Sequence, residues 1–160
     1  MRRTVLKTLL AALPITAVAA LGSRVAHAAD AVDTGTAAAG AGSDVRVVYH
    51  FADGLGQAAR GLANIRNHLR AEPGVQIVVV ALADGISFLL HDAVDAKGRS
   101  FAEQVEALAA RGVVFRVCGN TLAAHQVPLA RVLPQASVVP SGVAELARLQ
   151  ARQQFVYIRP

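Results

Sequence analysis

Short apolar runs alternate with longer amphipathic stretches along the last three-quarters of the sequence. This order is typical of a mainly parallel β-sheet that carries helices on both faces. The run Val75–Leu82 (VQIVVVAL) is nearly all apolar, as a strand covered on both sides should be. The alternation therefore predicts an α/β domain, and the chain of 160 residues leaves room for one such domain with accessory segments.

The pattern places five strands and four helices. The predicted strands are Val45–Phe51, Val75–Leu82, Val113–Val117, Ser137–Val139 and Phe155–Ile158, the last of them at an edge of the sheet. The predicted helices are an amphipathic one with apolar positions from Leu55 to Leu69, a short one at Gly85–His91, then Phe101–Arg111 and Gly142–Gln153. Ser141 is suited to cap the last helix.

The first 28 residues are typical of a secretory signal peptide. A basic start precedes an apolar run that ends at Leu21, and Ala26-His27-Ala28 offers a cleavage site. Arg2 and Arg3 also fit a twin-arginine signal, and an ordinary leader for the general secretory route is the alternative. A retained membrane anchor is disfavoured, because the run is shorter than the about 20 residues that span a bilayer. We expect a periplasmic or otherwise exported protein with a flexible linker at 29–43 and a domain at 44–160.

The charge of the chain belongs largely to this leader. The whole sequence has 16 Lys and Arg against 11 Asp and Glu, a net charge of +5. Removal of residues 1–28 takes away four basic and no acidic residues, which leaves 12 against 11 and a net charge of +1. The basic surface of a nucleic-acid-binding protein is therefore not expected. The one cysteine excludes an intrachain disulfide framework and a cysteine-based zinc site.

Cys118 is the strongest candidate for chemistry. It follows a predicted strand directly, and Asn120 or Thr121 could cap a short helix after it. A helix N-terminus favours thiolate over thiol, so the sulfur would be activated and open to solvent at the carboxyl edge of the sheet. His50 ends the first strand at the same edge, and it would lie near Cys118 if the first and third strands are neighbours. The alternative is that Cys118 is a small buried apolar residue.

The sequence gives weaker evidence for other kinds of reactive site. A metal site from His50, His91 and Cys118 is a third hypothesis, with few and distant ligands. The Gly-x-Gly-x-x-Gly phosphate loop is incomplete because position 59 is alanine, and no Gly-x-Ser-x-Gly nucleophile turn occurs. No cofactor is expected.

Two segments carry a specific pattern: Gly112–Leu122 (GVVFRVCGNTL) and the downstream Val139–Gln150 (VPSGVAELARLQ). Together with the rest of 44–160, they resemble exported members of the DsrE-like (DsrE/DsrF-like) family. This resemblance implies a three-layer sandwich with a five-stranded, mainly parallel sheet and assembly as a homo-oligomer. Leu82–Gly85 departs from the family pattern, which often has a histidine and a proline there.

The resemblance also implies a function. Relatives act in sulfur relay by holding sulfur as a persulfide on a cysteine, and Cys118 is the matching position. The first hypothesis is therefore a sulfur carrier, at most a sulfurtransferase, with His50 and Asn120 in supporting roles and a thiol protein or small sulfur donor as partner. The alternative is a non-catalytic exported module that binds a ligand or partner and keeps Cys118 for structure.

Overall fold

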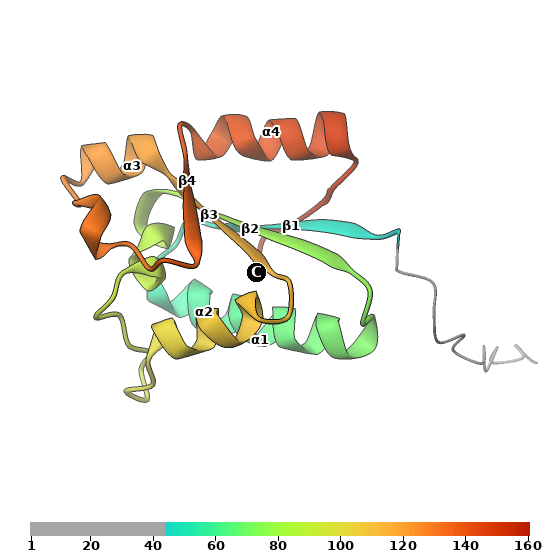
Figure 1. Cartoon of the computed structure of the whole chain (residues 1–160), viewed down its shortest axis with the longest axis horizontal. Coiled ribbons are helices and arrows are strands. Elements are labelled where there is room, and N and C mark those ends of the chain that lie inside the picture. Colours follow the sequence, from blue (N-terminus) through green and yellow to red (C-terminus); the bar gives the residue numbers. More distant parts are fainter. Residues whose placement is uncertain (1–43) are drawn as a thin grey trace, which may run out of the picture. The chain divides into compact units, whose positions relative to one another are not determined.

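A sheet of five parallel strands forms the centre of the part of the chain that the structure describes, and Figure 1 shows it between the helices. The computed structural model describes residues 44–160, so the predicted leader at 1–28 and linker at 29–43 lie outside the described residues. The strands are β1 (Arg46–Phe51), β2 (Gln76–Ala81), β3 (Val114–Cys118), β4 (Ala136–Val139) and β5 (Val156–Ile158). Their order is β4-β3-β2-β1-β5, and every pairing is parallel. The predicted α/β class is confirmed, with β5 at an edge.

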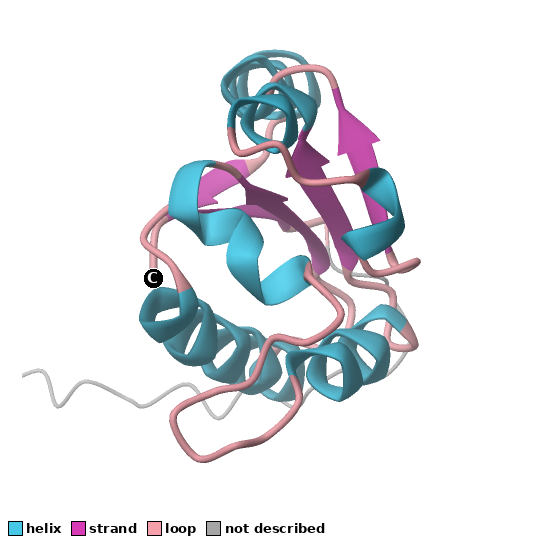
Figure 2. Cartoon of the chain, turned by 90° about the vertical axis from the view of Figure 1, so that its left-hand side faces the viewer, coloured by secondary structure: helices cyan, strands magenta, loops and turns pink. Residues whose placement is uncertain are grey.

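Helices cover both faces of the sheet. The helical elements are α1 (Leu55–Ala71), the 3₁₀ helix η1 (Ala83–Leu89), α2 (Phe101–Ala109), α3 (Gly119–Ala124), the 3₁₀ helix η2 (Leu129–Arg131) and α4 (Gly142–Gln153). Helices α1 and α2 lie against one face and α4 lies against the other (Figures 1 and 2). Among residues 44–160, no helix is long and apolar enough to cross a membrane.

Side-chain alternation along β1 supplies both hydrophobic layers. Val47, Tyr49 and Phe51 enter the large core beneath α1 and α2, while Val48 enters a smaller core with Leu149 of α4. Successive side chains of a strand point to opposite faces, so a strand covered on both sides must be apolar throughout. This explains the continuous apolar runs in the sequence.

Glycine at position 61 permits the close packing of α1 on the sheet. A Cβ at Gly61 would stand 2.3 Å from the ring of Phe51, so no larger residue fits without movement of the ring. The Phe51 ring in turn packs on Phe88, with ring centroids 5.1 Å apart. The aromatic centre of the core therefore depends on a helix that can approach β1 closely.

The strand order corrects one expectation. The sequence pattern left open that β1 and β3 are neighbours, but β2 lies between them. The connections from β1 to β4 all step in one direction, and α4 then returns the chain to the free edge of β1. Crossovers in parallel sheets are right-handed, so the returning helix lies on the face opposite α1 and α2.

One local prediction also needs correction, and one short element was not predicted. The helix expected at Gly85–His91 is the 3₁₀ helix η1, which begins at Ala83 and ends at Leu89. The short η2, which follows Pro128, was not anticipated. Helix α4 begins and ends where it was predicted, and the Ser141 hydroxyl accepts the Ala144 N–H at 3.3 Å as its cap.

Candidate functional site

Cys118 is both the last residue of β3 and the N-cap of α3. Its side chain lies on the α4 face of the sheet, because a Cβ added to Gly142 at the start of α4 would stand 3.1 Å from the Cys118 Cβ. Val139 of β4 pairs with Cys118 on one side, and Leu82 at the end of β2 lies on the other. The thiol therefore lies between the N-terminus of α3 and the N-terminus of α4.

Polar hydrogens converge on this sulfur. Burial raises the pKa of the Cys118 thiol, but hydrogen bonds from the Thr121 hydroxyl and from the backbone N–H groups of Gly142, Thr121 and Asn120 outweigh it. The pKa of Cys118 is therefore lower than that of an ordinary cysteine. Each of these groups donates to the sulfur, and such bonds are stronger to a thiolate than to a thiol. The arrangement favours a nucleophilic sulfur.

Thr121 has its hydroxyl direction fixed by a second contact. Its Oγ1 accepts the backbone N–H of Ala83 at 3.1 Å, in the turn that follows β2. A hydroxyl that accepts from one group donates its single hydrogen elsewhere, here to Cys118. Ala83 has a φ of 47°, a left-handed conformation that is uncommon outside glycine. This backbone conformation directs the Ala83 N–H toward the Thr121 hydroxyl.

The accessibility of the thiol differs from the expectation. Cys118 is only 5% exposed, so the sulfur is not open to solvent as predicted. The side chain is covered on three sides, by Leu82, Val139 and Gly142. The sulfur is nevertheless not in a purely aliphatic setting, because four hydrogen-bond donors face it. Its chemistry is that of a buried, polarised thiol.

His50 does not meet Cys118. Strand β2 separates the two residues. His50 of β1 pairs with Val80 of β2, and Val80 pairs with Arg116 of β3, which lies two residues before Cys118. Strand spacing and rise place the two Cα atoms about 12 Å apart. The predicted neighbourhood is wrong because it required β1 and β3 to be adjacent.

His50 belongs to a cluster at the β5 edge. Its Nδ1 is hydrogen-bonded to the Tyr157 hydroxyl at 2.7 Å. Burial, and then the positive charge of Arg159, lower the pKa of His50, while Asp53 opposes them. Arg159 donates to Asp53 at 2.6 Å, which ties the chain end to the loop after β1. His50 is thus a half-buried histidine with a lowered pKa, and it lies away from the thiol.

Asn120 acts through its backbone instead of its side chain. The N-cap of α3 is Cys118, no side-chain cap bond forms, and Asn120 lies inside the helix. Its N–H donates to the Pro140 carbonyl at 3.2 Å and also contributes to the lower pKa of Cys118. The expected side-chain cap is therefore absent, and the support that Asn120 gives to the thiolate comes from a group that every residue except proline has.

A partly buried ion-pair network beside the thiol was not predicted from the sequence. Arg116 lies two residues before Cys118 on the same face of β3 and pairs with Glu145 of α4. Arg148 donates to the same carboxylate from both Nε and Nη2, at 3.0 and 2.7 Å. An arginine inside the otherwise apolar strand VVFRV was the available signal, because a charge on a covered strand needs a partner.

The proposed metal ligands are not brought together. Within the part of the chain that the structure describes, no three His, Cys, Asp or Glu side chains gather to hold an ion. His91 follows η1, where its N–H donates to the Arg131 carbonyl at 3.1 Å. Its neighbour Asp92 pairs with the Arg131 guanidinium at 3.2 Å.

The fold and the thiol site define a class of small α/β proteins with a parallel five-stranded sheet and a cysteine at a strand-to-helix turn. The model of the DsrE/DsrF-like family matches residues 16–158. The chain therefore belongs to the DsrE/DsrF-like family. No curated protein matches the sequence.

Two solved structures are similar to this protein. A protein of unknown function from Methanobacterium thermoautotrophicum is 32% identical and has a TM-score of 0.65, over 72% of this chain and 99% of that one. The YchN protein from E. coli has a TM-score of 0.58 at 14% identity, over 72% of this chain and 97% of that one, and supports the fold alone. The family is associated with sulfur relay.

Proposed function

We propose that the protein is a sulfur carrier that holds sulfane sulfur as a persulfide on Cys118. One observation carries the proposal: four donors, from Thr121, Gly142 and Asn120, converge on the sulfur and lower its pKa despite burial. A thiolate is the form that attacks sulfane sulfur. Membership of a family associated with sulfur relay supports the same function.

The step needs no external oxidant. The Cys118 thiolate attacks the outer sulfur of a donor R–S–SH, a new S–S bond forms, and the donor S–S bond breaks. The products are Cys118–S–SH and R–S⁻, so the electron pair of the broken bond leaves with the donor thiolate. The same N–H and hydroxyl donors would then stabilise the persulfide anion. Transfer to an acceptor thiol is the reverse attack.

Intact mass measurement tests the proposal. The reduced 44–160 domain and the full chain are incubated with sodium polysulfide and weighed, with C118S as the matched control. We expect a gain of one sulfur atom in the wild-type protein, removed by a reducing thiol and absent from C118S. An unchanged mass after exposure to polysulfide would reject the carrier function.

The second candidate function is a binding module in which Cys118 is structural. Its supporting observation is the 5% exposure of the cysteine. Iodoacetamide labelling of the native protein separates the two functions. Labelling of the folded state at mildly acidic pH supports the carrier, whereas labelling that follows global unfolding supports the structural role.

Export and self-association are part of the proposal. The leader-like sequence at 1–28 favours an exported protein, with the mature chain starting at Ala29. N-terminal sequencing of the protein from the periplasmic fraction tests this start. The homo-oligomer implied by the family resemblance is tested by light scattering of the mature protein.

A further inference from the structure

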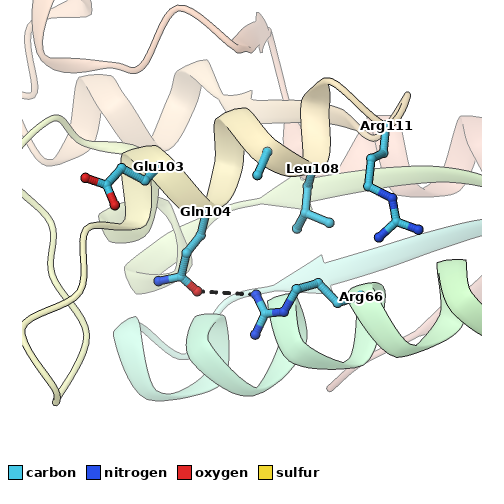
Figure 3. Close-up of a pocket in the computed structure, with 6 residues that line it drawn as sticks. Arg66, Glu103, Gln104, Leu108 and Arg111 are labelled. Atoms are coloured by element: carbon cyan, nitrogen blue, oxygen red, sulfur yellow. Dashed lines mark hydrogen bonds between the residues drawn. The ribbon is translucent and has the colours of Figure 1, made fainter.

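A pocket lies on the opposite face of the sheet from Cys118, where α1 and α2 run side by side (Figures 1 and 3). Its volume is about 260 Å³. The lining residues are Arg66 from α1 with Glu103, Gln104, Ala107, Leu108 and Arg111 from α2 and its end. No part of the proposed sulfur site reaches it, so the inference drawn from it is independent of that function.

The floor of the pocket is apolar. Leu108 is 2% exposed and belongs to the large core, so its side chain presents a fixed surface to the pocket. Ala107 adds a small side chain beside it and leaves space above the helix. A pocket of this volume has room for a ligand with one six-membered ring. Apolar floors with a few polar groups are typical of small-molecule sites.

Arg66 forms no ion pair with any residue of 44–160. Three arginines are half-buried within residues 44–160, and two of them, Arg116 and Arg148, share the carboxylate of Glu145. The third, Arg66, donates only to the neutral amide oxygen of Gln104, at 3.4 Å. A partly buried guanidinium is stabilised by an anion that it can bind through paired N–H groups.

Opposite charges lie at the two ends of the pocket. Figure 3 shows Arg111 at one end, Glu103 at the other, and the Arg66 guanidinium between them. Arg111 is exposed and forms no ion pair within the described part of the chain. An anion is therefore favoured between Arg66 and Arg111, and repelled from the end at Glu103.

We propose that this pocket binds a small carboxylate with an apolar body. The carboxylate lies between the guanidinium groups of Arg66 and Arg111, and the body covers Leu108 and Ala107. A molecule of about the volume of benzoate fits within the pocket. The amide of Gln104 keeps Arg66 in place, so binding needs no large rearrangement of the protein.

The test uses 4-fluorobenzoate as the probe and ¹⁹F line broadening as the measurement. The neutral 4-fluorobenzamide, nearly equal in shape, reports how much of the binding depends on charge. The double variant R66Q/R111Q removes both cations from the pocket. The matched control R60Q/R152Q removes two exposed cations from α1 and α4 and changes the net charge equally.

We expect saturable binding of the carboxylate, at least tenfold weaker binding of the amide, and at least tenfold weaker carboxylate binding by R66Q/R111Q. The control variant should bind as the wild type does. A second variant, A107L, fills the space over the floor and should abolish binding with both arginines present. Absence of binding at millimolar probe, equal binding of the amide, or equal losses in the two double variants would each overturn the proposal.

Discussion

Gly142 lies so close to Cys118 that a Cβ at position 142 would stand 3.1 Å from the Cys118 Cβ and 3.0 Å from the Leu82 Cδ2. The first turn of α4 thus rests directly on the end of β3. This contact brings the Gly142 N–H to the sulfur. The absence of a side chain at one helical position is therefore part of the thiol site.

The G142A variant should raise the pKa of Cys118. The added methyl group pushes the first turn of α4 away from β3, which lengthens the hydrogen bond from the Gly142 N–H. Overpacking costs about 1–3 kcal/mol, so the free energy of unfolding should fall by about that amount. Thiolate absorbance against pH and urea unfolding measure the two effects. V143A, at a position 67% exposed, is the control, and an unchanged pKa in G142A would contradict the prediction.

Thr121 should be replaceable by serine but not by valine. T121V keeps the shape and removes the hydroxyl that donates to Cys118, so the thiolate loses a hydrogen bond worth about 1.5–3 kcal/mol. The pKa of the thiol should therefore rise. At neutral pH the rate of iodoacetamide labelling should fall accordingly, and T121S should restore it. Equal pKa values in T121V and T121S would show that the hydroxyl has no such role.

Glu145 should be essential for stability. E145Q leaves the guanidinium groups of Arg116 and Arg148 without their shared carboxylate beneath α4. Removal of one partner from a buried pair costs about 3–5 kcal/mol, and the partial exposure of both arginines places the expected loss near 3 kcal/mol. The matched control D92N breaks the exposed pair with Arg131 and should cost under about 1 kcal/mol. Urea unfolding measures the free energy of unfolding of both variants. Equal losses in E145Q and D92N would contradict the prediction.

His50 should make the protein less stable at acidic pH. Burial and the charge of Arg159 lower its pKa in the folded protein, so protons bind more tightly to the unfolded chain. The free energy of unfolding should therefore fall as the pH drops below the ordinary histidine pKa of about 6.5, and level off below the folded pKa. H50Q should flatten this dependence, and H125Q, at an exposed position, should not. A wild-type slope in H50Q between about pH 7 and 5 would contradict the prediction.

Most of the fold was predictable because both faces of the sheet are covered. Val75–Leu82 is continuously apolar for that reason, and the observed β2 occupies Gln76–Ala81 within it. The amphipathic spacing from Leu55 to Leu69 likewise predicted α1. The region after β2 was harder, because a short 3₁₀ helix such as η1 has no periodicity long enough to distinguish it from an α-helix.

The site was predictable only in part. A strand followed by Cys-Gly-Asn-Thr located Cys118 at the carboxyl edge, and the structure places it there. Its enclosure by Leu82, Val139 and Gly142 depends on three segments distant in the sequence. The separation of His50 from Cys118 depends on strand order, which the pattern of one strand does not contain.

The sequence by itself determined the α/β class, the strand and helix segments and the position of the only cysteine at a strand end. Those features follow from local periodicity and from residues adjacent in the chain. The tertiary structure decided that β2 separates β1 from β3, that Thr121, Gly142 and Asn120 donate to the sulfur, and that the thiol is covered. These depend on which distant segments pack together, and packing is decided by the mutual fit of whole elements instead of the preference of any one of them.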